Sequence, residues 1–181
     1  KNPAYKDVVY ETFEFLEKEL LTMSGAFFSG IEGHGGRNEF YYTWTSSEVE
    51  RIIDNELFAK VFCDYYNIDA SDNKEERNIL HITKTKEDII AEYGLKANEL
   101  ESILFLGKQK LYRSRNKRLH PTFDNQIVTS WNALMLKGYI DAYRSFGNYL
   151  FLERAKTLAS FMTEKMYTRD NYLVHCTVGG K

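Results

Sequence analysis

The sequence predicts a mainly helical fold, an α/α repeat array in which short β segments join the helices. Two observations lead to this prediction. When the chain is shifted by 146 positions, the segment that begins at Asn2 lines up with the segment that begins at Asn148. The 181 residues also include only two prolines, so the helices can run long because few positions interrupt their backbone hydrogen bonds.

The two aligned segments share one apolar pattern. Under the shift, Tyr5 falls on Phe151, Val9 on Ala155, Phe13 on Ala159, Phe15 on Phe161, Leu16 on Met162 and Leu20 on Met166, while residues 26–28 fall on residues 172–174. A helix and a short apolar run that recur with one spacing are typical of repeat proteins. Such arrays bury their core between neighbouring repeats, so we expect this chain to be part of a larger array.

End signals and apolar periodicity predict the helices. Asn2 and Pro3 are typical of a helix start, and Gly25 is typical of a helix end. The connection at Gly147 and Asn148 is short, so the helices on either side should be antiparallel neighbours. The predicted helices run from Pro3 to about Gly25 and over residues 46–53, 56–66, 85–93, 95–116, 129–146 and 149–166. On helix 129–146, the side expected to face the core carries Trp131, Leu134, Met135, Gly138, Tyr139, Ala142 and Tyr143.

Short β segments are predicted between the helices. Residues 26–29 and 39–44 read as two strands, and the glycine-rich segment 30–38 would form the long tip of a β-hairpin. Residues 78–82 predict a further short strand. Thr45 or Ser46 is expected to cap helix 46–53, and the basic run 108–118 is expected to form a solvated helix face.

The composition argues against several classes of partner. The net charge is −2, from 24 basic and 26 acidic residues, which gives no electrostatic basis for binding nucleic acid or an anionic membrane. No apolar run approaches the ~20 residues that span a bilayer. Cys63 and Cys176 have no metal-binding spacing, which favours buried thiols in a cytoplasmic protein over a disulfide framework. We expect no cofactor and no metal site, since the chain has no phosphate-binding loop or dinucleotide motif.

Three motifs, in this order, resemble one protein family. The segment Phe27-Phe28-Ser29, the glycine-rich loop and the run 40–45 resemble its F-Y-S-A-x-D-A-D-S-x-G and F-Y-V-W-T motifs. Residues 78–81 are similar to its N-I-L-H motif. Residues 118–135 are similar to its R-x-x-P-x-x-D-D-K-x-L-T-S-W-N-x-L-M motif, which is long and specific. The family is the thioredoxin-domain-containing, spermatogenesis-associated-protein-20-like group, and the resemblance covers nearly the whole chain.

The resemblance implies an architecture. Family members combine an N-terminal thioredoxin-like domain with a helical (α/α) toroid related to N-acylglucosamine 2-epimerases and six-hairpin glycosidases. Residues 1–181 would then be a fragment of one toroid domain, a partial (α/α) toroid with short β-hairpins between helices, and the thioredoxin-like domain would lie outside this chain. The implied partners are that domain, the remaining toroid helices and a sugar ligand. A partial array exposes the faces that its neighbours would cover, so self-association is also expected.

The chain departs from the family motifs at two places. Where relatives have an acidic D-A-D-S-E run, this sequence has Gly30-Ile31-Glu32-Gly33-His34. Where they have Asp-Asp-Lys, it has Asp124-Asn125-Gln126. Carboxylates and a lysine have thus become neutral or changed place, which favours altered or lost activity.

Sugar chemistry at the centre of a toroid would need a general acid and a general base. The catalytic candidates are Asp124, Glu32 and His34. Asp124 precedes a helix and would either point into the central funnel or cap a turn. Glu32 and His34 lie on the glycine-rich segment, which would be either a tip that closes over a ligand or an ordinary surface loop.

Substrate binding would need aromatic faces and a few polar groups. Trp131 would either stack on a sugar ring or belong to the core, and Asn132 would bind either substrate or the backbone at the helix start. Asn125 is a substrate-binding or turn residue. Tyr42 and Arg37 complete the candidate set, and Arg37 would clamp a carboxylate or phosphate.

Two functions follow from these candidates. The first is a carbohydrate-active domain of the sugar epimerase, isomerase or glycosidase type. The second is a non-catalytic scaffold or substrate-binding domain that works with a thioredoxin-like domain. Convergence of Asp124, Glu32 and Trp131 on one cavity would favour the enzyme, whereas their dispersal or burial would favour the scaffold.

Overall fold

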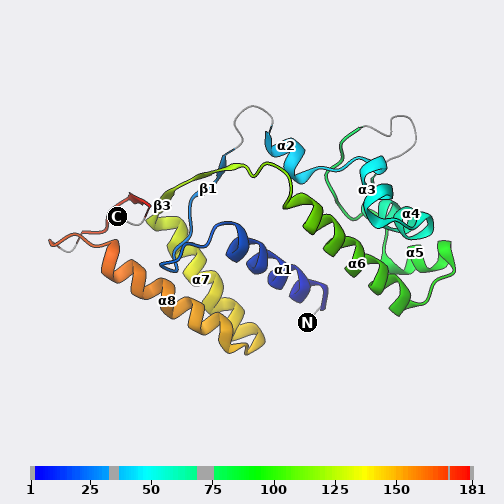
Figure 1. The fold of residues 1–181 in the computed structure, drawn as a ribbon. Helices are drawn as coiled ribbons and strands as arrows, with labels where there is room; N and C mark the ends of the chain where they lie inside the picture. Colours follow the sequence, from blue (N-terminus) through cyan, green and yellow to red (C-terminus); the bar gives the residue numbers. More distant parts are fainter. Residues whose placement is uncertain (1–2, 33–36, 69–75, 171, 180–181) are drawn as a thin grey trace. The chain divides into compact units, whose positions relative to one another are not determined.

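The computed structural model describes residues 3–32, 37–68, 76–170 and 172–179. These residues are mainly helical and include two small antiparallel sheets (Figure 1). The chain divides into two compact units: unit 1 comprises residues 1–32 and 122–181, and unit 2 comprises residues 33–121. None of the described helices is long and apolar enough to cross a lipid bilayer.

Unit 1 is built from helices and very short strands. The helices are α1 (Pro3–Glu19), α7 (Thr129–Phe146) and α8 (Tyr149–Lys165), and the strands are β1 (Gly30–Glu32), β2 (Thr122–Asp124), β3 (Gln126–Val128) and β4 (Cys176–Val178). β1 pairs with β2, with Gly30 opposite Asp124, and β3 pairs with β4, with Val128 opposite Cys176. One residue separates β2 from β3, so a single stretch of chain pairs with both β1 and β4.

The predicted repeat is confirmed in unit 1. α1 and β1 occupy residues 3–19 and 30–32, and α8 and β4 occupy residues 149–165 and 176–178, so every boundary is shifted by 146 positions. The connecting turns match too. An antiparallel bridge joins Leu21 to Phe27 after α1, and the equivalent bridge joins Tyr167 to Leu173 after α8. We call α1–β1 the first copy and α8–β4 the second copy.

Aromatic side chains pack the three helices of unit 1 together. Phe13 of α1 stacks on Tyr139 of α7, with ring centroids 4.6 Å apart, and its centroid lies 5.0 Å from that of Phe151 of α8. Glu17 of α1 accepts hydrogen bonds from the Tyr139 hydroxyl at 2.9 Å and from Arg154 at 3.1 Å. These contacts fix α1 against both later helices.

The turn between α7 and α8 follows from two residues. Gly147 ends α7 with a φ of 69°, a left-handed conformation that costs glycine little. Asn148 caps α8, because its side chain accepts a hydrogen bond from the Leu150 N–H at 3.0 Å. α7 and α8 are therefore adjacent antiparallel helices, as predicted (Figure 1).

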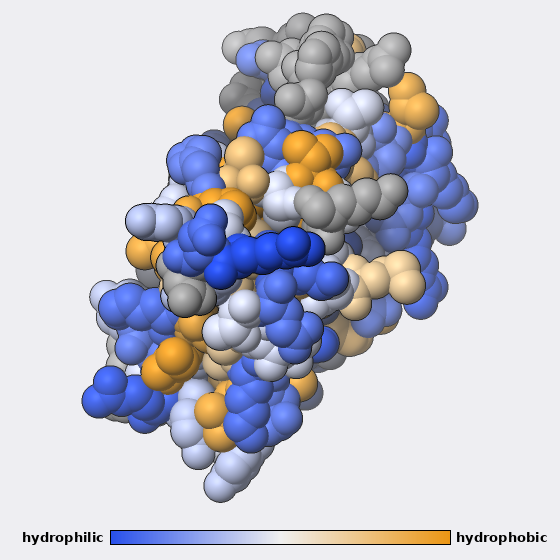
Figure 2. All heavy atoms as spheres, turned by 90° about the vertical axis from the view of Figure 1, so that its left-hand side faces the viewer, coloured by the Kyte–Doolittle hydropathy of each residue, from blue (hydrophilic) through white to orange (hydrophobic). Residues whose placement is uncertain are grey.

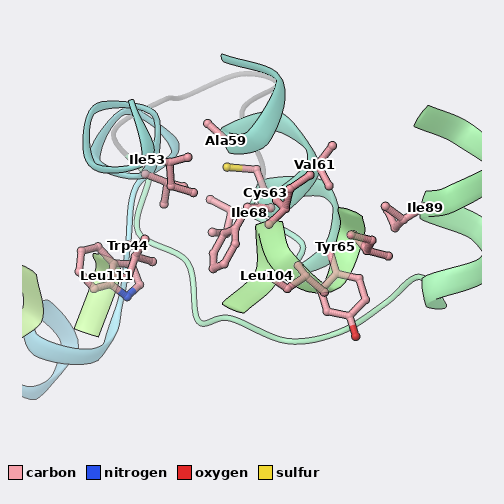
Figure 3. Packing of buried hydrophobic residues seen from close by; sticks show 14 residues of the cluster. Trp44, Ile53, Ala59, Val61, Cys63, Tyr65, Ile68, Ile89, Leu104 and Leu111 are labelled. Atoms are coloured by element: carbon pink, nitrogen blue, oxygen red, sulfur yellow. The ribbon is translucent and has the colours of Figure 1, made fainter. Parts of the chain in front are cut away.

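Unit 2 contains α2 (Arg37–Tyr42), α3 (Ser46–Ile53), α4 (Glu56–Tyr65), α5 (Lys86–Tyr93) and α6 (Ala97–Arg115). The last four agree with the predicted ranges within two residues at each end. Their buried side chains point toward one another and form one hydrophobic core (Figure 3). The core residues are Trp44, Val49, Ile53, Ala59, Val61, Phe62, Cys63, Tyr65, Ile68, Ile89, Leu100, Ile103, Leu104 and Leu111.

The close approach of α6 to α4 depends on Gly107. A Cβ atom at this position would lie 2.4 Å from the ring of Phe62, which is fully buried. Because a buried ring cannot move aside freely, no larger residue fits at position 107 without strain. The glycine is therefore a packing requirement of the core.

A capping box fixes the start of α3. The Thr45 hydroxyl accepts a hydrogen bond from the Glu48 N–H, and the Glu48 carboxylate accepts one from the Thr45 N–H, both at 3.1 Å. Of the two caps that the sequence left open, the structure selects Thr45. The T-x-x-E spacing is the signature of this motif.

Two β predictions are wrong. The hairpin over residues 26–44 does not form, because β1 pairs with β2 and the second predicted strand begins as helix α2. The aromatic run 40–44 has the composition of a strand, but only Trp44 makes a β contact, an isolated bridge to Asn78. The strand predicted over residues 78–82 does not form in the described structure, where the bridge from Asn78 to Trp44 is its one β contact.

The buried side of α7 also differs from the prediction. Tyr139 and Ala142 are buried as expected, but Trp131 and Leu134 are exposed. Asn132 is buried instead. A buried amide is tolerated because its polar atoms are hydrogen-bonded to the protein.

Candidate functional site

Asp124 ends β2, at the point where one stretch of chain changes its partner from β1 to β4. Its Oδ2 atom accepts a hydrogen bond from the Ser29 hydroxyl at 2.5 Å, and Oδ1 accepts one from the Gln126 N–H at 3.1 Å. One carboxylate oxygen thus binds the backbone of this strand junction, and the other binds the side chain of Ser29. Asp124 caps a turn, which is one of the two roles expected from the sequence.

Asn132 lies in the first turn of α7 and is 1% exposed. Its Oδ1 atom accepts a hydrogen bond from the Phe27 N–H at 2.8 Å. Its Nδ2 atom donates to the carbonyl oxygens of Phe27 and Val128, both at 3.0 Å. The side chain thus binds the backbone N–H and the backbone C=O of one residue, Phe27, as a residue of a neighbouring antiparallel strand would. Of its two expected roles, the geometry matches backbone binding.

Trp131 and Asn125 lie at the surface of unit 1. Trp131 is 55% exposed, so its indole face is accessible to a ligand or to another protein element. The side chain of Asn125 is exposed, and its carbonyl oxygen accepts a hydrogen bond from the Gly179 N–H at 2.9 Å. Around the start of α7, polar groups hold the backbone and an aromatic ring faces outward.

The remaining predicted site residues are placed only in part. His34 lies outside the described residues, and so do the side chains of Glu32 and Arg37, whose backbones belong to β1 and α2. Tyr42 is half-buried at the end of α2, with its ring centroid 5.2 Å from Cζ of Arg115. The candidates whose side chains the structure describes are divided between the units: Asp124, Asn125, Trp131 and Asn132 belong to unit 1, and Tyr42 belongs to unit 2.

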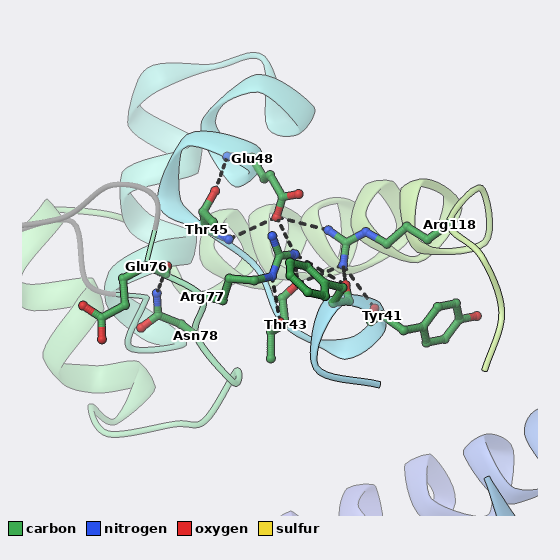
Figure 4. A network of polar contacts seen from close by, with 9 residues as sticks. Tyr41, Thr43, Thr45, Glu48, Glu76, Arg77, Asn78 and Arg118 are labelled. Carbon is green, nitrogen blue, oxygen red and sulfur yellow. Dashed lines mark hydrogen bonds and ion pairs between the residues drawn. The ribbon is translucent and has the colours of Figure 1, made fainter. Parts of the chain in front are cut away.

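A polar cluster that the sequence did not predict lies in unit 2, with Glu48 at its centre (Figure 4). Oε2 of Glu48 accepts hydrogen bonds from Nη2 of Arg77 and Nη2 of Arg118, each at 3.1 Å. The three side chains are half-buried, so solvent screens these ion pairs less than it screens exposed ones. We call Glu48, Arg77 and Arg118 the arginine cluster.

Both arginines also bind carbonyl groups at the C-terminal end of α2. Nη1 of Arg118 donates to the carbonyl oxygens of Phe40, Tyr41 and Thr43, at 2.5, 3.1 and 2.8 Å. Arg77 donates to the carbonyl oxygen of Thr43 at 2.8 Å and to its hydroxyl at 3.0 Å. The last carbonyls of a helix lack intrahelical partners and carry partial negative charge, so guanidinium donors stabilise them.

Aromatic rings flank the basic side chains of this region. Cζ of Arg118 lies 3.8 Å from the ring centroid of Trp44, which is the geometry of a cation–π contact. Burial lowers the pKa of Arg118, and the neighbouring Glu48 opposes that shift. Arg115 lies within 5.3 Å of the ring centroids of Tyr41, Tyr42 and Tyr112. The solvated face predicted for the basic run is therefore wrong at these two arginines.

An open hollow of about 270 Å³ lies beside the arginine cluster. It is lined by Phe40, Tyr41, Glu48, Arg77, Arg118 and Leu119. Two guanidinium groups against one carboxylate give its wall an excess of positive charge. Most of the donors in that wall already bind α2 and Glu48, so the main effect of the cluster is to fix the short helix α2 in place.

Part of this cluster was detectable in the sequence. The T-x-x-E spacing signals the cap that positions Glu48, and Arg118 opens the longest family-like motif. The meeting of Arg77 with Arg118, 41 positions later, has no local signal. Long-range pairs of this kind depend on the packing of α6 against the other helices of unit 2.

Of the two free cysteines, Cys63 belongs to the core of unit 2. No three His, Cys, Asp or Glu side chains gather into a metal site in the part of the chain that the structure describes. Cys63 is buried, and burial, followed by the charges of Glu50 and Asp64, raises the pKa of its thiol to about 12. The thiol is therefore protonated and a poor nucleophile at neutral pH.

Comparison with known proteins gives one consistent result. The chain is similar to spermatogenesis-associated protein 20. The human protein is 22% identical over 188 residues and the mouse protein 23% over the same length, each covering 90% of this chain and 24% of the relative. An uncharacterised Caenorhabditis elegans protein is 22% identical over 185 residues, covering 90% of this chain and 25% of its own length.

These similarities support the family resemblance that the motifs indicated. No family model matches the chain. The chain spans about a quarter of the length of the curated relatives that it matches. The names of these relatives specify no reaction and no ligand.

Proposed function

We propose that this chain is a non-catalytic scaffold module of a larger helical protein, which works with a thioredoxin-like domain. The hydrogen bonding at the start of α7 carries this proposal. Asp124 and Asn132 are the polar groups best placed in the sequence for chemistry, and both bind the backbone of their own unit. A carboxylate and an amide used in this way serve the architecture rather than a reaction.

The surface of unit 1 supports the same function. Large apolar side chains remain exposed on its helices, namely Tyr5, Val8, Phe15, Trp131, Leu134, Ile140, Tyr149 and Leu150. Hydrophobic residues also stand in separate patches among hydrophilic ones on the face shown in Figure 2. Exposed apolar surface is typical of faces that another protein element covers, and helical repeats bury such faces against their neighbours.

Carbohydrate binding is the second candidate function, and one observation favours it. The exposed indole of Trp131 is accessible to a sugar ring, and aromatic faces are common in ligand sites. A sugar epimerase or glycosidase would also need a free acid and base, and the carboxylate of Asp124 is engaged with Ser29 and Gln126. The aromatic face therefore supports binding more than it supports turnover.

Tryptophan fluorescence separates the two candidates. The chain has two tryptophans, of which Trp44 is 4% exposed and Trp131 is accessible. The scaffold function predicts that titration with glucose, mannose, N-acetylglucosamine and N-acetylmannosamine gives no saturable change in emission. A saturable change that disappears in Trp131→Phe, with Trp44 kept as the reference, would overturn the scaffold and establish a sugar site.

A further inference from the structure

We propose that the turn of the second copy is a docking site for a helix that follows residue 181 in the same polypeptide. That helix would place the side-chain amide of an Asn or Gln on the backbone N–H and C=O of Leu173, as Asn132 of α7 does on those of Phe27. The proposal rests on the proposed scaffold function and specifies which surface the next repeat covers.

The two turns have the same backbone hydrogen bonds. In the first copy, Thr22 N–H donates to the Ala26 carbonyl oxygen at 2.8 Å, and Phe28 N–H donates to that of Leu20 at 3.0 Å. In the second copy, Thr168 N–H donates to the Tyr172 carbonyl oxygen at 2.8 Å, and Val174 N–H donates to that of Met166 at 2.9 Å. Each residue of the second set is the residue of the first set shifted by 146 positions. The turns are therefore equivalent in structure as well as in position.

These bonds determine which way the central peptide groups point. In each turn the two bonds lie on either side of a pair of opposite residues that are not hydrogen-bonded to each other. The pair is Leu21 and Phe27 in the first copy, and Tyr167 and Leu173 in the second. The N–H and C=O groups of such a pair point away from the partner strand. Phe27 and Leu173 thus each present one donor and one acceptor on the outer side of the turn.

In the first copy this outer side is covered. Asn132 binds both the N–H and the carbonyl oxygen of Phe27, and Phe27 is 6% exposed. The ring centroid of Phe27 lies 6.2 Å from that of Tyr139, and Ala26 is fully buried. α7 thus binds the first turn through one amide and adjoining apolar contacts.

In the second copy the same side is open. Leu173 is 54% exposed and Tyr172 is 73% exposed. Within the described residues, no group forms a hydrogen bond with the N–H or the carbonyl oxygen of Leu173. The apolar side chains and the outward N–H and C=O groups of Leu173 therefore form a surface that matches the covered one at Phe27.

The chemistry of this surface selects its occupant. Only a primary amide combines a donor and an acceptor on one planar side-chain group that matches a peptide, which points to Asn or Gln. In the first copy, the amide that binds Phe27 belongs to Asn132, in the first turn of α7, a helix that lies later in the same polypeptide. The matched relatives are about four times as long as this chain, so further helices of the same polypeptide are the occupant we infer.

Amide hydrogen exchange tests the proposal. The Leu173 and Phe27 amides are followed by NMR in the 181-residue chain and in the natural polypeptide extended through the helical pair after residue 181. We expect Phe27 to exchange slowly in both and Leu173 to slow by about tenfold or more in the extended polypeptide. Replacing the amide-bearing residue of the added helix with Ala should restore fast exchange. Equal Leu173 exchange in both polypeptides would overturn the proposal.

A substitution gives a second readout. Leu173→Asp should leave the Tm of the 181-residue chain unchanged and lower the Tm of the extended polypeptide. Met23→Asp changes a fully exposed residue of the first turn and should alter neither Tm. Concentration-dependent protection of Leu173 in a dimer of the short chain would assign the surface to a second copy and overturn the proposal. Saccharide binding at Trp131 would overturn the scaffold function alone, so the two failures are distinguishable.

Discussion

The side-chain amide of Asn132 is hydrogen-bonded to both the backbone N–H and the backbone C=O of Phe27, 105 residues earlier in the chain. Asn132→Ala would leave that buried N–H and carbonyl unpaired, so we expect the free energy of unfolding to fall by about 2–4 kcal/mol. Chemical denaturation measures this change. Asn125→Ala is the control, because its side chain is exposed and its loss should cost at most about 0.5 kcal/mol. Equal effects of the two substitutions would contradict the structural role of Asn132.

Gly107 and Gly138 are both helical glycines, but their surroundings differ. In Gly107→Ala the new Cβ would lie 2.4 Å from the Phe62 ring, so the free energy of unfolding should fall by about 1–3 kcal/mol. In Gly138→Ala the new Cβ would make an ordinary contact, 3.6 Å from Phe13, so stability should be unchanged or rise by up to about 1 kcal/mol. Denaturant titration of both variants measures the difference. Equal stability of Gly107→Ala and Gly138→Ala would show that α6 does not pack closely against Phe62 of α4.

Arg118→Lys tests the arginine cluster. Lysine keeps the positive charge but loses the planar fork that binds three carbonyl groups and Glu48, and it loses the stacking on Trp44. We expect the free energy of unfolding to fall by about 1–3 kcal/mol and the Trp44 emission to change. The emission is read in a Trp131→Phe background. Arg113→Lys, at an exposed position of the same basic run, should have little effect on either quantity.

Tyr139 should make stability depend on pH in the alkaline range. Burial, followed by the hydrogen bond to Glu17, raises the pKa of its hydroxyl above the ordinary value of about 10. The unfolded chain then loses this proton at a lower pH than the folded chain, so the contribution is complete below pH about 10 and declines as the pH rises further. Tyr139→Phe should therefore reduce the decline in unfolding free energy above pH about 10. Tyr5→Phe, at an exposed position, should keep the wild-type dependence of the unfolding free energy on pH. An unchanged dependence in Tyr139→Phe would contradict the role given to the Tyr139 hydroxyl.

The two cysteines should differ in reactivity. Cys63 is buried with a pKa raised to about 12, whereas Cys176 is half-buried. At pH near 8, iodoacetamide should modify Cys176 first and reach Cys63 only after the protein unfolds, because the thiolate is the nucleophile. Mass spectrometry of the modified peptides reads the order. Simultaneous modification of both thiols in the folded chain would show that the core of unit 2 is open.

Most helix ends were predictable because their signals are local, although α1 ends at Glu19, before the Gly25 that the sequence indicated. The ends of α7 and α8 follow from Gly147, which adopts a left-handed conformation, and from Asn148, which caps the next helix. The repeat was predictable because equal apolar spacing in two helices survives the shift of 146 positions. Capping residues and periodicity act within one or two turns, so a single sequence contains them.

The strand partners were not predictable because pairing joins distant residues. β1 pairs with a segment about 90 positions later, and no residue near Gly30 indicates that choice. The run 40–44 is aromatic and strand-like, but part of it forms α2, whose last carbonyls are bound by Arg77 and Arg118. The secondary structure of this run is thus determined by contacts with residues much later in the chain and not by its local composition.

The candidate site shows the same limit. The sequence identified Asp124 and Asn132 as polar groups in a specific motif, and both hold positions that matter for the architecture. Their partners, Ser29 and Phe27, lie about 100 positions away, and those partners decide whether each side chain binds backbone or ligand. Spacing around the motif does not contain that information.

Amide exchange at Phe27 tests the scaffold account most directly. The account predicts that this amide is strongly protected in the native chain and that Asn132→Ala removes the protection while amides in the centre of α8 stay protected. That result would show that the polar group at the start of α7 binds the repeat itself. An unprotected Phe27 amide in the native chain, or unchanged protection in Asn132→Ala, would contradict the account and leave Asn132 free to bind a ligand.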